Sequence, residues 1–185
     1  MLSGLLFWLS PARRSFMRRL ARPGLARFRA SLDQCGSESA VRVLSILLQA
    51  NAEFLAYALS RKGPLKPFAA GATPDTVEAC LAALLIYSAN LFLRDEMAKN
   101  ESEMIPLLAQ VVGTDPKHVM LMRDNLRKAP RSEEWLLFTR LAQDLGAARP
   151  EYDAELERSF GYQYLSYVDQ YRPMVMRELE RVQLN

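Results

Sequence analysis

Residues 41–59 read VRVLSILLQANAEFLAYAL, a run in which apolar side chains recur at the spacing of an α-helix. The turn residues Gly36 and Ser37 precede this run and a Gly/Pro-rich loop follows it, so we predict one long helix that begins after Ser37 and ends near Lys62. Its apolar side chains cover more than a single stripe, which indicates that other helices surround it. We expect this helix to be the centre of the core, through the regularly spaced residues Val41, Leu44, Leu48, Leu55 and Leu59.

A second long helix is predicted over residues 73–99. Thr73 is a good N-cap residue, and Pro74 suits the first helical position. The uncharged stretch 79–93 within it is shorter than the roughly 20 apolar residues that cross a bilayer, so we interpret it as a buried core helix.

The two long helices should form an antiparallel hairpin about a loop near Phe68. This register places Glu53 opposite Ala83 and brings Arg42 close to Asp95. No cation lies opposite Glu53 in this arrangement, and a buried carboxylate without one is costly. A buried Glu53 would be a candidate functional site. We favour the interpretation that Glu53 points to solvent beside Gln49, and we predict an ion pair between Arg42 and Asp95.

The remaining sequence is also helical in pattern. Helices are predicted over residues 101–112, 116–128 and 133–145, the last capped by Ser132 and ended by Gly146, and a final helix is predicted from Pro150 to the C-terminus. No segment alternates with period two for long enough to form a strand. The predicted fold class is all-α, a multi-helix bundle of about five to seven helices with a short basic amphipathic N-terminal segment.

Charge divides the chain into two parts. The 185 residues contain 24 Lys and Arg against 21 Asp and Glu, a formal net charge of +3. Residues 1–32 hold seven Arg and no acid, a charge of +7, so the other residues carry the difference between +3 and +7, which is −4. We predict a basic N-terminal segment over residues 1–32 and a helical bundle domain over residues 33–185.

The basic segment contains two predicted short helices, residues 11–22 and 25–32, separated by a stop at Pro23-Gly24. Each has an apolar side and an arginine side, which permits three interpretations. The apolar side packs on the bundle; or the segment lies on an anionic membrane surface; or it is a mitochondrial transit peptide, which places the mature protein in the matrix. If the segment is not a transit peptide, we expect a cytoplasmic protein that is peripheral to the membrane. The predicted membrane or anion contacts are Trp8, Arg13, Arg14, Arg18, Arg19 and Arg22.

A helix-turn-helix over residues 105–128 is the alternative. Ala109, Gly113 and Val119 have the spacing of the small residue, turn glycine and aliphatic core residue of such a unit. Residues 119–122 are all apolar, however, whereas a helix that reads a DNA groove needs polar side chains on its outer side. Two bundle helices joined by a glycine turn explain the same pattern. A basic cluster keeps the alternative open: Arg123, Arg127, Lys128 and Arg131.

Catalytic and metal chemistry have little support in the sequence. His118 is the one histidine, so a site that needs two imidazoles cannot be built in one copy. Asp115 lies three residues before it, and we interpret the pair as a helix-end histidine beside an N-cap aspartate. Cys35 and Cys80 are interpreted as free thiols. We expect no catalytic residue, no metal and no cofactor.

Tyrosine side chains gather in the predicted C-terminal helix, where Tyr164, Tyr167 and Tyr171 share one face. Rows of tyrosine are common at protein interfaces, so these three are the predicted partner interface, although the same row could line the edge of the bundle. The sequence thus favours a non-enzymatic helical interaction protein that docks through its basic N-terminus on an anionic membrane surface or a protein partner. The alternative function is a DNA-binding regulator, with nucleic acid ranked below the other partners.

Overall fold

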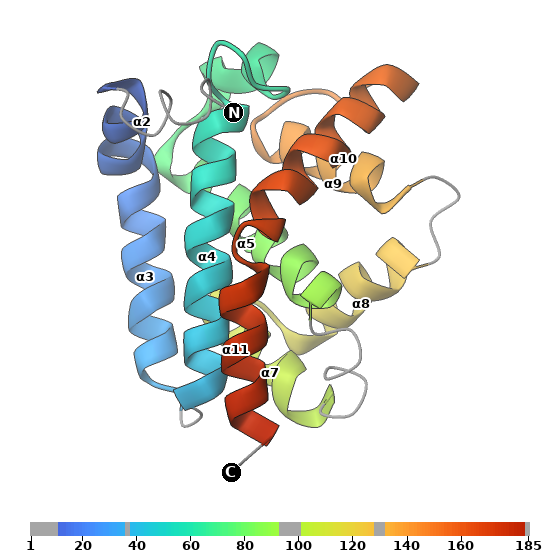
Figure 1. Ribbon diagram of the computed structural model, residues 1–185. Coiled ribbons are helices and arrows are strands. Elements are labelled where there is room, and N and C mark those ends of the chain that lie inside the picture. Colours follow the sequence, from blue (N-terminus) through green and yellow to red (C-terminus); the bar gives the residue numbers. More distant parts are fainter. Residues whose placement is uncertain (1–10, 36–37, 93–100, 128–131, 184–185) are drawn as a thin grey trace.

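The fold is described from a computed structural model, which defines residues 11–35, 38–92, 101–127 and 132–183 (Figure 1). These residues form helices and no strand, so the expected all-α class is confirmed. The described α-helices number nine, more than the five to seven expected. In chain order the elements are α2 Pro11–Phe16, the π-helical turn η1 Met17–Ala21, α3 Arg22–Asp33, α4 Glu38–Ala58, the 3-10 helix η2 Lys66–Gly71, α5 Pro74–Phe92, α7 Glu101–Val112, α8 Pro116–Arg127, α9 Glu133–Asp144, α10 Ala154–Asp169 and α11 Arg172–Gln183.

Helix α4 lies at the centre of the bundle, as its apolar pattern predicts. It packs against α3, α5, α10 and α11, and Figure 1 shows α3, α4 and α11 side by side. The side-chain amide of Asn51 on α4 donates to the Ser88 hydroxyl on α5 at 2.9 Å. This pairing lies close to the predicted hairpin register, which placed Glu53 opposite Ala83.

Helix α5 is the second core helix. Among the described residues it is the one helix long and apolar enough to cross a membrane, and 61% of its apolar window is buried inside the protein. Burial of that kind is what a core helix shows, because its apolar side chains are covered by α4 on one side and α9 on another.

The predicted helix ends are formed by the expected residues. The Thr73 hydroxyl accepts from the Thr76 N–H at 3.3 Å, and the Ser132 hydroxyl accepts from the Trp135 N–H at 3.2 Å. Gly146 has φ +83°, and the adjacent Ala147 N–H reaches back to the Ala142 carbonyl at 3.0 Å. This is the left-handed helix end that glycine adopts without strain.

The N-terminal helix continues through the predicted stop at Pro23-Gly24, so that prediction is wrong. The turn before Pro23 is π-helical, with the Arg22 N–H bonded to the Met17 carbonyl. Proline lacks an N–H and its ring clashes with the carbonyl four residues earlier; a widened turn accommodates both. Gly24 is buried, and a Cβ there would lie 3.1 Å from the Cβ of Glu78, so glycine allows α3 to approach α5 closely.

The N-terminal segment and the bundle share one core. Four apolar residues of η1 and α3 are buried in the same cluster as α4 and α5: Ala21, Leu25, Phe28 and Leu32. The predicted boundary at residue 33 therefore passes through a continuous core and does not separate two packed units.

The predicted C-terminal helix is broken, and its start is later than expected. Helix α10 begins after Asp153, whose carboxylate accepts from the Glu155 N–H at 2.8 Å, and it ends at Asp169. Pro173 explains the break, because it cannot donate a helical hydrogen bond to residue 169. The break lets α10 and α11 each pack against α4 in a different direction (Figure 1).

Candidate functional site

Arginines of η1 and α3 form an exposed basic face. Arg18, Arg19 and Arg22, which we call the basic face, are all exposed, and within the described ranges none of them has an ion-pair partner. Arg27, by contrast, is used within the fold, because it pairs with Glu78 at 2.6 Å. Three solvated guanidinium groups that form no ion pair within the described residues are available to an external anion.

The apolar side of the same helix is already occupied. Phe16, Met17 and Leu20 are half-buried against the core, and Ala21 is fully buried. Their burial leaves the segment unable to insert these side chains into a bilayer while it stays folded on the bundle. Cleavage of a transit peptide near Leu32 would also remove core residues, among them Leu25 and Phe28.

The other predicted contacts of this segment are less defined. Trp8 lies outside the described residues, and the side chains of Arg13 and Arg14 on α2 are likewise not among those that the structure defines. Of the six predicted membrane or anion contacts, the three residues of the basic face are therefore the ones whose side chains the structure describes.

The three tyrosines of the predicted partner interface turn toward α4. Tyr164 is fully buried, and its hydroxyl donates to the Asn51 amide oxygen at 3.0 Å. Tyr167 is half-buried and stacks on Tyr57 with ring centroids 5.3 Å apart. Tyr171 is half-buried and donates its hydroxyl to the Glu53 carboxylate. All three contact the chain's own core helix, and Tyr164 is inaccessible to any partner of the folded chain.

Glu53 is buried, so the prediction that it points to solvent is wrong. Only 3% of the residue is exposed. One carboxylate oxygen accepts from the Gln49 amide at 2.6 Å and the other accepts from Tyr171. Hydrogen-bond donors on both oxygens offset part of the cost of burying the charge. The two-helix register includes only α4 and α5, so it gives no information on Tyr171, which lies in the turn between α10 and α11, 118 residues further along the chain.

A second polar group crosses the core through Asn51. It joins Ser88 of α5 to Tyr164 of α10, and all three residues are fully buried. Burial raises the pKa of Tyr164 well above its ordinary value, and burial is also the main cause of the raised pKa of Tyr87 beside it. Both phenols are therefore neutral at physiological pH, and the Tyr164 hydroxyl serves as a hydrogen-bond donor.

Arg42 forms an ion pair with α11, while its predicted pair with Asp95 stays a prediction. Its guanidinium lies 3.5 Å from the Glu178 carboxylate on α11. Asp95, the predicted partner, lies outside the described residues. Since α11 packs along α4, an acid on α11 is available to Arg42 that the two-helix register could not include.

The pair α7 and α8 has the turn expected of a helix-turn-helix. Gly113 has φ +70°, and Ala109 and Val119 are buried. The outer side of α8 presents Met120 at 39% and Leu121 at 57% exposure, which is an apolar surface for a helix that would read base edges.

The basic cluster that supported the helix-turn-helix is only partly described. Arg123 is 7% exposed and its guanidinium lies 3.0 Å from Asp124, so it is turned into the protein. The side chain of Arg127 is not among those described, and Lys128 and Arg131 lie outside the described residues.

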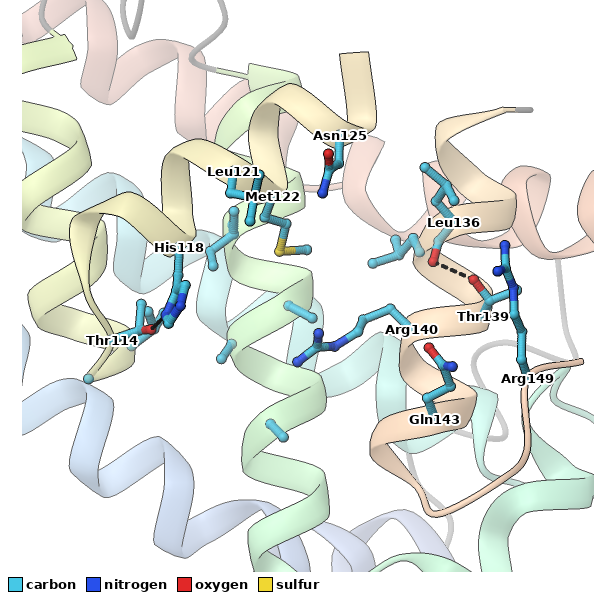
Figure 2. Close-up of a pocket in the computed structure, with 17 residues that line it drawn as sticks. Thr114, His118, Leu121, Met122, Asn125, Leu136, Thr139, Arg140, Gln143 and Arg149 are labelled. Atoms are coloured by element: carbon cyan, nitrogen blue, oxygen red, sulfur yellow. Dashed lines mark hydrogen bonds between the residues drawn. The ribbon is translucent and has the colours of Figure 1, made fainter. Parts of the chain in front are cut away.

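His118 is an exposed residue in the first turn of α8. Its Nδ1 lies 3.2 Å from the Thr114 hydroxyl (Figure 2). Asp115 caps the helix by accepting from the Lys117 N–H at 2.7 Å. Asp115 is therefore the N-cap that the sequence predicted. Among the described residues, no group of three or more His, Cys, Asp or Glu side chains could hold a metal ion.

Both cysteines are free thiols with raised pKa values. Cys80 is fully buried, and burial is the main cause of its raised pKa. Cys35 is half-buried, its thiol donates to the Ser31 carbonyl at 3.3 Å, and burial raises its pKa as well. Thiols held in the protonated form are poor nucleophiles.

We expect the native chain to react with an aromatic disulfide reagent at Cys35 only, and slowly, because Cys80 needs an unfolding event to be reached. Absorbance during labelling would report one thiol in the native chain and both in denaturant. Cys35→Ser isolates the second thiol, and rapid labelling of Cys80 in that folded variant would contradict its burial.

Comparisons of the chain with protein-family models, curated proteins and solved structures find no match. Function is therefore inferred from the residues themselves. The sequence identified the arginines of the basic face and missed the buried Asn51 group, although an asparagine within a long apolar run is a signal for such a group.

Proposed function

We propose that this chain is a non-enzymatic helical protein that docks on an anionic membrane surface through the basic face. Two features of the same segment support this proposal. Its three arginines face solvent and form no ion pair within the described residues, and its apolar side is packed against the bundle. Docking of this kind is electrostatic, with the arginines at the headgroups and the helix outside the hydrocarbon.

Electrostatic docking has a characteristic dependence on lipid and salt. A basic residue near an anionic membrane contributes about 1 kcal/mol, and this contribution falls off within a Debye length. Binding should therefore require anionic lipid and should weaken as salt is raised. Insertion of an apolar helix, by contrast, resists salt, because burial of apolar surface does not depend on screening.

The test is co-sedimentation of the full chain with vesicles of phosphatidylcholine that do or do not contain phosphatidylserine. Replacing Arg18, Arg19 and Arg22 together with Gln should lower the partition coefficient on the anionic vesicles by about 30- to 150-fold, or about 2–3 kcal/mol. Truncation is a poorer test, because removing α3 would expose the core.

A matched control carries the same change in net charge elsewhere. Arg61, Arg158 and Arg177 are exposed residues outside the basic face, and their joint replacement by Gln should leave vesicle binding within about twofold of the original chain. Equal losses in the two variants would show that only net charge matters and would contradict docking through this face. Equal sedimentation with neutral and anionic vesicles would contradict the electrostatic mode.

The DNA-binding alternative has one supporting feature, the tight turn between α7 and α8. The exposed apolar residues of α8 and the inward position of Arg123 give it fewer contacts with an anionic duplex than the basic face offers to lipid. Salt-sensitive retention of a DNA duplex, without retention of anionic vesicles, would favour the regulator and overturn the membrane proposal.

A further inference from the structure

Helices α5, α8 and α9 enclose an open cleft of about 670 Å³ (Figure 2). Helix α5 forms its floor, because it packs against both α8 and α9, whereas those two helices diverge. On each wall the lining residues follow helical spacing, as in His118, Leu121, Met122 and Asn125 of α8. Three helix faces therefore point into one space.

The floor of the cleft is apolar and is formed mainly by small side chains. Ala79, Ala82 and Ala83 lie on one face of α5, followed one turn later by Ile86. Small side chains at these positions leave room above the helix, and larger apolar side chains surround that room. Leu121 at the edge is 57% exposed, which is a high exposure for a leucine beside a concave surface.

The polar lining of the cleft is cationic. Arg140 and Arg149 line it together with Thr139 and Gln143, and the described lining contains no carboxylate. Figure 2 shows Arg140 reaching from α9 across the cleft toward α5, with the Gln143 amide beside it.

The two arginines differ in their partners. Arg140 is held by Asp144, with its Nε at 3.0 Å from the carboxylate. The Arg149 guanidinium has no ion-pair or hydrogen-bond partner within the part of the chain that is defined. A free guanidinium at the edge of an apolar space is suited to a planar anion such as a carboxylate.

We propose that the cleft binds a free single-chain amphiphile with a carboxylate headgroup, a fatty acid. The headgroup pairs with Arg149 at the edge of the cleft, and the alkyl chain lies along the alanine floor of α5 beside Leu121 and Met122. The volume falls within the range of roughly 300–1,000 Å³ that ligand pockets occupy. Nine of the seventeen lining residues are apolar, and the others include the polar and charged groups that would orient a headgroup. This site is separate from the basic face, so either proposal can fail without the other.

The test is calorimetric titration of the full chain with decanoate, and with decanol as a ligand of equal chain length but neutral headgroup. Decanoate should bind at least about five- to tenfold more tightly than decanol, because the charge-assisted hydrogen bonds to Arg149 need the carboxylate. Arg149→Gln should remove most of that difference. Arg158→Gln is the matched control on an exposed helix face outside the cleft and should leave both affinities unchanged.

Two further variants test the position of the alkyl chain. Ala82→Phe fills the floor and should weaken decanoate more than tenfold. Leu121→Ser changes an exposed side chain, so it should preserve the thermal unfolding midpoint while it weakens both ligands by about threefold. Absence of decanoate binding, equal affinity for the two ligands, or binding that is indifferent to Arg149→Gln and Leu121→Ser would overturn the proposal.

Discussion

Replacing Phe54 with alanine is expected to lower the free energy of unfolding by about 3–5 kcal/mol, the usual cost of truncating a buried aromatic residue. Phe54 is fully buried on α4. Its ring lies 4.8 Å from the ring of Tyr164, 5.6 Å from Phe160 and 5.8 Å from Tyr167, each in an edge-to-face arrangement. Truncation would leave a cavity where α4 and α10 meet and would remove three aromatic contacts at once.

Denaturant unfolding followed by circular dichroism measures this loss. Tyr162→Ala is the control, because Tyr162 lies on the same helix as Phe160 but is 77% exposed, so its loss should change stability by less than about 0.5 kcal/mol. Phe54→Leu keeps most of the volume and should cost less than Phe54→Ala. A loss below about 1 kcal/mol for Phe54→Ala would mean that α10 does not pack on α4 as described.

Local signals in the sequence predicted the helices and most of their ends. Thr73, Ser132 and Gly146 act through hydrogen bonds or backbone angles within a few residues, and such effects are visible in the sequence itself. The apolar pattern of residues 41–59 likewise identified the central helix, since a helix surrounded by others must be apolar on several sides.

Proline and glycine signals failed where tertiary packing outweighed them. By local sequence alone, Pro23-Gly24 is expected to end a helix. In the structure a π-helical turn accommodates the proline, and the glycine allows the close contact of α3 with Glu78. At Pro173 the error is the opposite one: the last helix was predicted to continue past this proline, because the helical pattern continues on both sides of it, but the structure has a break there. Each outcome depends on which helix lies opposite, and that information is absent from the local sequence.

The two candidate sites differ in how far sequence could define them. The basic face is a property of composition, since seven arginines without an acid are visible in residues 1–32. The cleft depends on tertiary structure, because α5, α8 and α9 each contribute one row of lining residues. Arg149 lies in a connection between helices and becomes a lining residue only when α9 is in place.

Asn51 on α4 forms side-chain hydrogen bonds to both α5 and α10, which explains why a polar residue occupies the centre of an apolar core. Its amide donates to Ser88 on α5, and its oxygen accepts from Tyr164 on α10. A shift of α4 along either neighbour would leave buried groups without partners, so this group favours one alignment of the helices over others. Ser88 also donates to the Leu85 carbonyl at 3.2 Å, which completes the chain of hydrogen bonds.

Asn51→Ala should therefore lower the free energy of unfolding by about 3–4 kcal/mol, because it strands the Tyr164 hydroxyl, removes the donor to Ser88 and leaves a small cavity. Tyr164→Phe should cost about 1–3 kcal/mol, since it leaves the Asn51 oxygen unsatisfied. The double variant should be less destabilised than the two single losses combined, by about 1–2 kcal/mol, because each single change strands the partner that the other removes. Losses that add to within about 0.5 kcal/mol would show that Asn51 and Tyr164 are not coupled, and the alignment of α4 with α10 would then depend on aromatic contacts such as those of Phe54 and of Tyr57 with Tyr167.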